Sequence, residues 1–147
     1  MPLSDRELFA RLIKCEAEGE GEFGMKAVAT VVMNRVHVSY GEYFRVCQGS
    51  LRRVILQPFQ FTCALTTVYG KYNPQNIYNM RPDDFHYQIA DWALSGNKLS
   101  GLGSALWYYN PFSAVCATYF PKTRTGIYIT RIAQHCFYNP TPLYAKT

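Results

Sequence analysis

The sequence contains no apolar run of transmembrane length, and it does not open with a basic region followed by an apolar core. We therefore expect no membrane span and no secretory signal, with synthesis in a cytoplasm. Only 17% of the residues are charged and 48% are hydrophobic, which excludes a disordered chain. A length of 147 residues predicts one domain, residues 1–147, with a sizeable core.

Metal-binding patterns are missing as well. The five cysteines are widely spaced without a C-x-x-C pair, and with three histidines they give no zinc spacing. We expect no metal, no cofactor, and reduced thiols that are mostly buried. A cysteine nucleophile served by His86 or His135 stays open, because such partners meet only in the fold, but no cysteine has a recognisable electropositive neighbourhood. The five are Cys15, Cys47, Cys63, Cys116 and Cys136.

The net charge of +5 favours anionic partners, of which cell-wall polymer and nucleic acid are two. Lysines and arginines are scattered, however, and Arg52-Arg53 is the only adjacent pair. Because the sequence has neither a basic stripe nor a nucleic-acid motif, we expect no nucleic-acid partner. An RNA-binding module is the weakest alternative, and general solubility is the commoner meaning of such a surplus.

A capped amphipathic helix from Asp5 to Glu18 is the most informative feature that is present. Ser4 and Glu7 form the pattern of a capping box, and Gly19 is the expected C-terminal breaker. The helical spacing of the apolar residues predicts one inward face, and a glutamate continues it. The residues of this face are Leu8, Phe9, Leu12, Ile13 and Glu16.

Water is scarce on such a face, which raises the pKa of Glu16. The helix dipole and the like charges of Glu18, Glu20 and Glu22 are expected to raise this pKa further. A carboxyl group that keeps its proton near neutral pH is what a general acid requires. The alternative is a solvated acidic loop with Glu16 at the rim of the apolar face, since structural networks also perturb pKa values.

The remaining elements predict a helix-dominated α+β fold with a small β element. A second helix that is apolar nearly all round marks the centre of the core, and a later helix has Phe85, Ile89, Trp92 and Ala93 on its inner face. The stretch Pro58 to Met80 is expected to be loop. The predicted helices are Met25 to Val36, a short helix that starts after Ser50 and ends before Pro58, and a helix that opens at Pro82 and is closed by Gly96. The predicted strands cover Ala105 to Tyr109 and, as one or two strands, Gly126 to Tyr138.

Several short motifs, taken together and in order, resemble the SleB/CwlJ family of cell-wall hydrolases. The resemblance extends over roughly residues 7 to 138, and two positions depart from the family pattern: Glu18 stands where an arginine is usual, and Ala133 where a glycine is usual. No counterpart is found for the stretch Thr67 to Met80. The matching motifs are Glu16 to Glu20, Gly24, Ala27 to Val36, Gln60-Phe61-Thr62, Tyr108 to Pro111 and Ile132 to Phe137.

The resemblance implies a lysozyme-like domain, related to goose-type lysozyme and the lytic transglycosylases, that cleaves the β-1,4 bond between N-acetylmuramic acid and N-acetylglucosamine in peptidoglycan. Glu16 occupies the position of the family's catalytic acid. The other motifs nominate residues for the glycan cleft, where polar groups combine with flat apolar walls. They are Gln60, Phe61, Thr62, Tyr109 and Asn110, with Glu20, Tyr108 and His135 as further candidates; for His135 a structural role is the alternative.

A lytic transglycosylase needs one carboxyl group, which acts first as acid and then as base. A hydrolytic muramidase needs a second carboxylate, for which Glu18, Glu20, Glu22 and Glu42 remain. We expect Glu16 to act alone and to form 1,6-anhydro ends. Hydrolysis and a non-catalytic glycan-binding or structural protein stay as alternatives. The expected partner is the glycan strand at the cell wall, in a spore or after delivery by a phage; the need for an accessory protein is open.

Overall fold

The N-terminal part of the chain forms two helices joined by a tight turn, as expected from the sequence. The structure is a computed structural model and describes residues 2–147. Helix α1 (Asp5–Ala17) begins where the Ser4 hydroxyl accepts a hydrogen bond from the Glu7 amide. It ends one residue earlier than predicted, because residues Glu18–Glu20 form the 3-10 turn η1. Gly21, with φ +77°, takes the breaker role predicted for Gly19.

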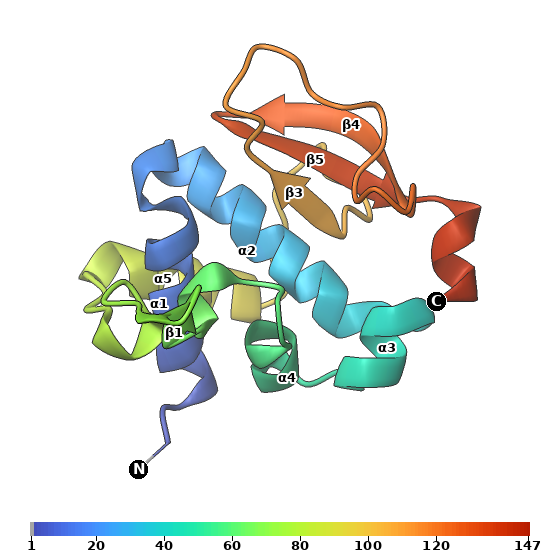
Figure 1. Cartoon of the computed structure of the whole chain (residues 1–147). Helices are drawn as coiled ribbons and strands as arrows, with labels where there is room; N and C mark the ends of the chain where they lie inside the picture. The colour runs from blue at the N-terminus through green and yellow to red at the C-terminus, as the bar shows by residue number, and fades with distance from the viewer. Residues whose placement is uncertain (1) are drawn as a thin grey trace.

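Helix α2 (Gly21–His37) crosses the middle of the molecule between the other helices and the sheet (Figure 1). It begins four residues before the predicted start, because η1 leads directly into it. Its apolar residues face helices on one side and the sheet on the other, which explains the lack of a polar face. The apolar side chains buried completely are Ala27, Val28, Ala29, Val31 and Val32.

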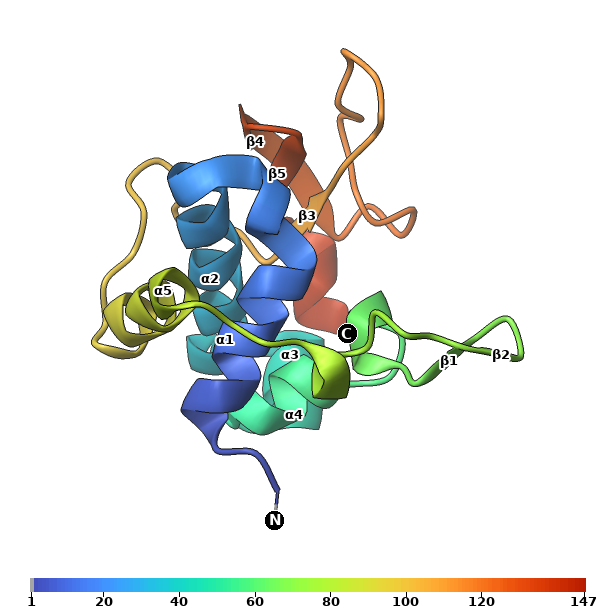
Figure 2. The ribbon, with the colours of Figure 1, turned by 90° about the vertical axis from the view of Figure 1, so that its left-hand side faces the viewer.

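The middle of the chain contains more regular structure than predicted. Helix α3 (Gly41–Cys47) was missed, while α4 (Leu51–Leu56), capped by Ser50, was expected. The stretch expected to be loop holds the 3-10 turns η2 (Thr62–Ala64) and η3 (Ile77–Asn79). Between them, strands β1 (Thr67–Val68) and β2 (Lys71–Tyr72) form a hairpin that projects from the body of the molecule (Figure 2).

Helix α5 (Asp84–Leu94) packs against α1 and α2, but its inner face differs from the prediction. Asp83 is the N-cap, so Pro82 lies outside the helix. Phe85 is 39% exposed and Trp92 is partly buried. The buried face is instead formed by His86, Ile89, Ala90 and Ala93. The capping box explains the change. The His86 side chain turns back and accepts a hydrogen bond from the Asp83 amide, which buries it in the core.

The predicted small β element is an antiparallel sheet in the order β3–β5–β4. It consists of β3 (Trp107–Tyr109), β4 (Gly126–Ile132) and β5 (His135–Pro140). Ala133, in the tight turn between β4 and β5, has φ +51°, a conformation that favours glycine. The backbone conformation at position 133 therefore explains why the family usually has a glycine where this chain has Ala133. The 3-10 turn η4 (Pro142–Lys146) ends the chain against α3.

The prediction that all five cysteines are reduced is wrong. Cys116 and Cys136 form a disulfide bond with their Cα atoms 5.9 Å apart. It ties the long segment after β3 to strand β5, across a sequence separation of 20 positions. The free cysteines are Cys15, Cys47 and Cys63.

Helices and sheet share their interior. One group of buried side chains runs from Leu8 to Tyr144, and a smaller one joins α2 to the sheet through Val31 and Phe137. Across residues 2–147, no helix combines the length and the apolar character needed to cross a bilayer.

Candidate active site

Glu16 lies in the last turn of α1, at the point where the helix meets the sheet. Its side chain is partly buried, and the Tyr108 hydroxyl on strand β3 donates a hydrogen bond of 2.7 Å to its Oε1. Two residues 92 positions apart thus meet at one carboxyl group. The predicted inward position of Glu16 is therefore observed, and Tyr108 is its direct partner.

Burial raises the pKa of Glu16 above its ordinary value, as predicted. The hydrogen bond from Tyr108 and the positive charge of Arg35 lower this pKa, but less than burial raises it. The net result is a carboxyl group that holds its proton more firmly than one in water. Two groups beside it also favour the anion that forms when the proton leaves.

We predicted that the like charges of Glu18, Glu20 and Glu22 raise the pKa of Glu16. This prediction is wrong, because each of these carboxylates lies beside a cation or an ionisable group. Glu18 lies 3.6 Å from Lys14 Nζ, and Glu22 lies 3.1 Å from Lys26 Nζ. Glu20 lies 3.0 Å from His135 Nδ1. Each neighbouring carboxylate therefore has its own positive or ionisable partner, which reduces its repulsion of Glu16.

Arg35 was not singled out from the sequence, although it belongs to the motif helix. Arg35 is 5% exposed, and its guanidinium carbon lies 4.7 Å from the Tyr43 ring centroid and 5.2 Å from that of Phe61. Nε donates to the Leu106 carbonyl at 2.7 Å, while buried Nη1 has no hydrogen-bond partner. An arginine on a mostly apolar, buried helix was the signal that could have identified it. Burying a charge costs free energy unless the charge is paired, so a buried arginine indicates a function or a partner.

Glu16 and Tyr108 each line a different hollow. The first, of about 390 Å³, is lined by Glu16, Glu20, Asn110 and His135 among others. The second, also of about 390 Å³, is lined by Arg35, Glu42, Gln60, Trp107 and Tyr108 among others. We call them the Glu16 cavity and the Arg35 cavity. Because Tyr108 lines one and its hydroxyl contacts a residue of the other, the pair joins the two.

The predicted glycan-binding residues fall into two groups. Asn110 lines the Glu16 cavity and Gln60 lines the Arg35 cavity, where Gln60 Oε1 accepts a hydrogen bond of 2.8 Å from Tyr43. Thr62 is exposed at the start of η2 and lines neither cavity. The structure therefore places Asn110 in the cavity of Glu16 and Gln60 in the cavity lined by Tyr108, the hydrogen-bond partner of Glu16.

Phe61 and Tyr109 lie away from the cavity surfaces. Phe61 is 2% exposed and packs beneath the guanidinium of Arg35. Tyr109 points to the opposite side of strand β3 from Tyr108, stacks on Phe120 at 4.4 Å, and accepts a hydrogen bond from the Ala117 amide. Both side chains support their neighbours and offer little surface to a ligand.

Glu20 and His135 form a pair at the edge of the Glu16 cavity. His135 Nδ1 and Glu20 Oε1 lie 3.0 Å apart, which is ion-pair distance, and His135 Nδ1 has no hydrogen-bond partner. Burial lowers the pKa of His135, which Glu20 opposes. The His135 ring meets the Tyr108 ring edge-on at 4.9 Å. His135 therefore helps to fix the orientation of Tyr108, which agrees with the structural alternative for this histidine.

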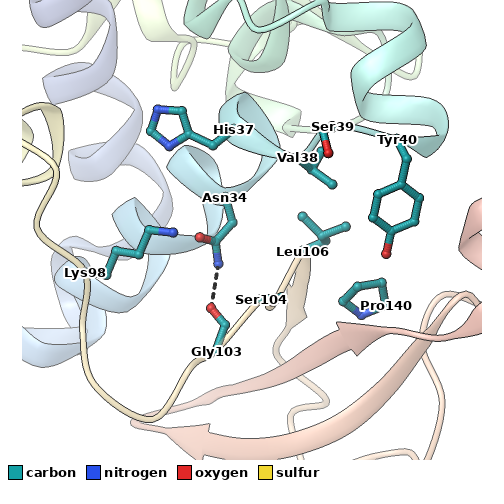
Figure 3. Close-up of a pocket in the computed structure, with 10 residues that line it drawn as sticks. All are labelled: Asn34, His37, Val38, Ser39, Tyr40, Lys98, Gly103, Ser104, Leu106 and Pro140. Atoms are coloured by element: carbon teal, nitrogen blue, oxygen red, sulfur yellow. Dashed lines mark hydrogen bonds between the residues drawn. The ribbon is translucent and has the colours of Figure 1, made fainter.

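A further hollow, of about 280 Å³, lies at the other end of α2 (Figure 3). Its polar lining residues include Asn34, His37 and Lys98. The Asn34 side-chain amide donates hydrogen bonds to backbone carbonyls in the segment before β3. None of its lining residues is acidic. It therefore offers no carboxyl group for acid catalysis, unlike the Glu16 cavity.

Comparison with known proteins identifies the family of this chain. A family model described as Cell Wall Hydrolase matches residues 19–138. The chain belongs to this family. It is 30% identical over 138 residues to the cell wall hydrolase CwlJ of Bacillus subtilis, covering 94% of this chain and 87% of the relative. The resemblance to the SleB/CwlJ family is thereby confirmed, as is the prediction that the chain is an enzyme of this class.

Solved structures confirm the predicted fold class. This cell wall hydrolase is similar to the catalytic domain of the germination-specific lytic transglycosylase SleB from Bacillus anthracis, with a TM-score of 0.65 and 27% identity over 95% of this chain and 97% of the other. The catalytic domain of the Bacillus cereus SleB protein gives a TM-score of 0.62, with 27% identity over 92% of this chain and 89% of that one. The family match begins at Gly19, so the case for Glu16 rests on its geometry and charge.

Proposed function

We propose that this cell wall hydrolase cleaves the β-1,4 bond between N-acetylmuramic acid and N-acetylglucosamine in peptidoglycan, with Glu16 as general acid. One observation carries the proposal: a carboxyl group whose pKa is raised by burial borders a cavity and is held by Tyr108. Family membership supplies the class of substrate.

In the first step Glu16 donates its proton to the glycosidic oxygen, and the bond to the anomeric carbon breaks. Glu16 is then an anion in a site that is poor in water. The hydrogen bond from Tyr108 and the charge of Arg35 stabilise that anion. These two contacts therefore act on the state that develops during bond cleavage, which is where they accelerate the reaction.

In the second step the same carboxylate takes the proton of the muramic C6 hydroxyl, whose oxygen attacks the anomeric carbon. The product carries a 1,6-anhydro ring, Glu16 regains its proton, and no water is consumed. This route needs one carboxyl group, which agrees with a pKa of Glu16 raised by burial without a second carboxylate among its causes.

Hydrolysis is the second candidate, and one observation favours it: Glu18 and Glu20 line the same cavity as Glu16. Against it, Glu20 faces His135, and its other oxygen accepts the Gln134 amide at 3.4 Å. Glu42 lines the Arg35 cavity, and Glu18 and Glu22 face lysines. We therefore propose transglycosylation as the reaction.

Substrate contacts are proposed from the two cavities. Asn110 offers an amide to the glycan beside Glu16, and Gln60 and the unpaired Nη1 of Arg35 offer polar groups on the other side of Tyr108. Thr62 is accessible for contacts at the edge. Phe61 holds Arg35 in place, and Tyr109 holds the segment after β3, so both act by positioning.

The Cys116–Cys136 disulfide supports a place of action outside a reducing cytoplasm, because such bonds persist in oxidising surroundings. The cell wall is such a place, both for an enzyme laid down in a spore and for one delivered by a phage. We propose action on the wall in either setting.

The decisive variant is Glu16→Gln, which removes the transferable proton and keeps the shape. We expect it to remain folded, to bind insoluble peptidoglycan, and to lose clearing of a wall suspension by at least about 1,000-fold. Glu22→Gln is the matched control, because it makes the same change at a carboxylate that is paired with Lys26 and lines neither cavity, and it should clear like the wild type. If Glu16→Gln clears the suspension as well as Glu22→Gln, the role of Glu16 is contradicted. If neither variant cleaves peptidoglycan, the result favours a non-catalytic glycan binder.

A further inference from the structure

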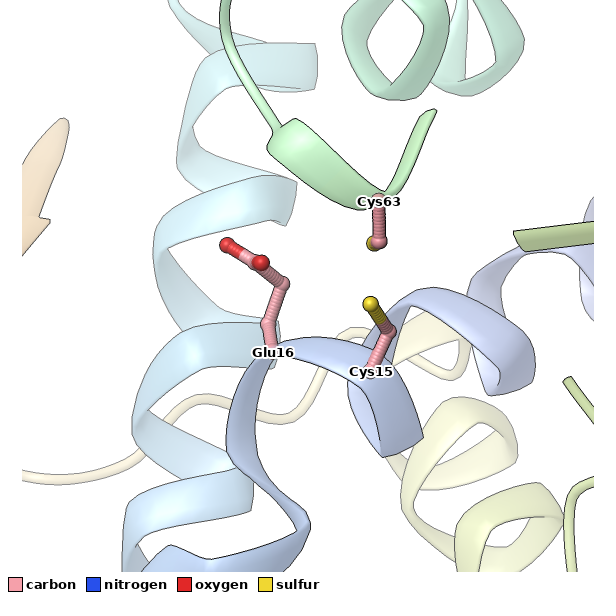
Figure 4. Close-up of side chains that lie close together, drawn as sticks. All are labelled: Cys15, Glu16 and Cys63. Atoms are coloured by element: carbon pink, nitrogen blue, oxygen red, sulfur yellow. The ribbon is translucent and has the colours of Figure 1, made fainter. Parts of the chain in front are cut away.

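Two thiol groups lie beside the proposed catalytic carboxyl group. The Sγ atoms of Cys15 and Cys63 and one carboxylate oxygen of Glu16 all lie within 4.8 Å of one another. Figure 4 shows the two sulfur atoms facing each other, with the Glu16 side chain next to Cys15. In the part of the chain that the structure describes, no other three such side chains meet this closely.

This spacing is close to that of a tetrahedral metal site. Zinc–sulfur bonds of about 2.3 Å and zinc–oxygen bonds of about 2.1 Å place neighbouring ligand atoms roughly 3.5–3.8 Å apart. Side-chain shifts on the order of 1 Å therefore bring all three atoms onto one ion. Two thiolates and a carboxylate are ligands that zinc and cadmium accept, while magnesium and calcium prefer oxygen alone.

The site also has an entrance. Cys15 and Glu16 both line the Glu16 cavity, whereas Cys63 is 3% exposed and closes the group from within. An ion entering from the cavity keeps room for water as a fourth ligand. Two thiolates and one carboxylate exceed the charge of a divalent ion by one, and the nearby Arg35 guanidinium offsets that excess.

We propose that Cys15, Cys63 and Glu16 form a binding site for a zinc-class divalent ion, and that the bound ion inhibits the enzyme by occupying the carboxyl group. Binding displaces the two thiol protons and the carboxyl proton to solvent, forms two metal–sulfur bonds and one metal–oxygen bond, and transfers no electrons. Affinity should therefore rise with pH. Inhibition, but not binding, rests on the proposed function of Glu16.

Cadmium titration tests binding directly, because cadmium–thiolate bonds absorb in the ultraviolet. Thiol counting on the unfolded protein first shows that Cys15, Cys47 and Cys63 are reduced. We expect one Cd²⁺ per chain in the wild type and a loss of affinity of at least about tenfold in Cys15→Ser and Cys63→Ser. Cys63→Ala repeats the test if serine is not tolerated at this buried position. Cys47→Ser, which changes the third free cysteine, should bind like the wild type.

Clearing of a wall suspension tests inhibition. Zn²⁺ should inhibit the wild type and Cys47→Ser, a chelator should restore both, and Cys63→Ser should stay active in Zn²⁺. No cadmium–thiolate band in the wild type, or an equal band in Cys63→Ser, would overturn the site. Binding without inhibition would overturn the inhibitory role and count against Glu16 as the acid, so the two failures are distinguishable.

Discussion

The Tyr108 hydroxyl lies 2.7 Å from Glu16 Oε1 and donates a hydrogen bond to it. This contact joins the end of α1 to strand β3, and therefore joins the helical part of the fold to the sheet. Tyr108 is itself held by the edge-on ring of His135. Burial favours the protonated form of Glu16, whereas Tyr108 favours its anion, so the pair balances the two states that proton transfer connects.

Replacing Tyr108 by phenylalanine tests that balance. Glu16 must be protonated to act as an acid, so activity falls as the pH rises through its pKa. Loss of the hydrogen bond raises the pKa of Glu16, so the alkaline limb of the kcat/KM profile should move to higher pH. The rate should fall roughly 10–100-fold, because a hydrogen bond to a charged group is worth about 1.5–3 kcal/mol. An unmoved limb, measured on a soluble glycan fragment, would contradict the assignment.

Arg35 should influence the same limb through its charge. Arg35→Gln removes a cation whose field lowers the pKa of Glu16, so the limb should again move to higher pH. Arg35→Lys retains the charge and serves as the control, with a smaller movement of the limb. If both variants have the same pH profile as the wild type while KM rises, Arg35 contributes to binding only.

The unusual pKa of Glu16 also predicts an effect on stability. A carboxyl group whose pKa is higher in the folded than in the unfolded protein costs no stability at acid pH, and destabilises the fold as the pH rises past its unfolded value. Glu16→Gln should therefore be more stable than the wild type at neutral pH, by about 1 kcal/mol, the usual scale of a stabilising substitution. Urea unfolding across pH measures the difference, which should shrink at acid pH. A difference that does not change with pH would refute the account.

The disulfide should contribute measurably to stability. Changing both Cys116 and Cys136 to serine frees a loop of about 20 residues, for which chain entropy predicts a loss of about 3 kcal/mol. Urea unfolding of the double variant against the oxidised wild type gives this value. Cys47→Ser, which breaks no covalent link, controls for the loss of a buried thiol. A double variant as stable as the wild type would show that the sheet alone fixes this segment.

Local pattern predicted α1, α2 and the inward position of Glu16, because helical periodicity places apolar residues and that glutamate on one face. It failed at Phe85, where a capping histidine took the buried position instead. It also missed α3, whose helical conformation the buried side chains of Tyr43 and Cys47 support within the core.

The candidate site was harder to predict because its contacts are distant in sequence. Arg35 reaches Glu16 only through the packing of α2 on α1, and the Cys116–Cys136 pair forms only when the segment after β3 folds back onto β5. The grouping of Cys15 with Cys63 likewise arises only when η2 folds onto the end of α1. Motif resemblance supplied Gln60 and Asn110, which periodicity alone does not distinguish from other polar loop residues.

The most direct measurement of the central claim is the mass of the glycan ends released from purified peptidoglycan by the wild type and by Glu16→Gln, in water enriched in heavy oxygen. A single carboxyl group acting in turn as acid and base predicts anhydro ends without heavy oxygen from the wild type, and no new ends from the variant. Reducing ends that contain heavy oxygen, or cleavage by Glu16→Gln at the wild-type rate, would contradict it.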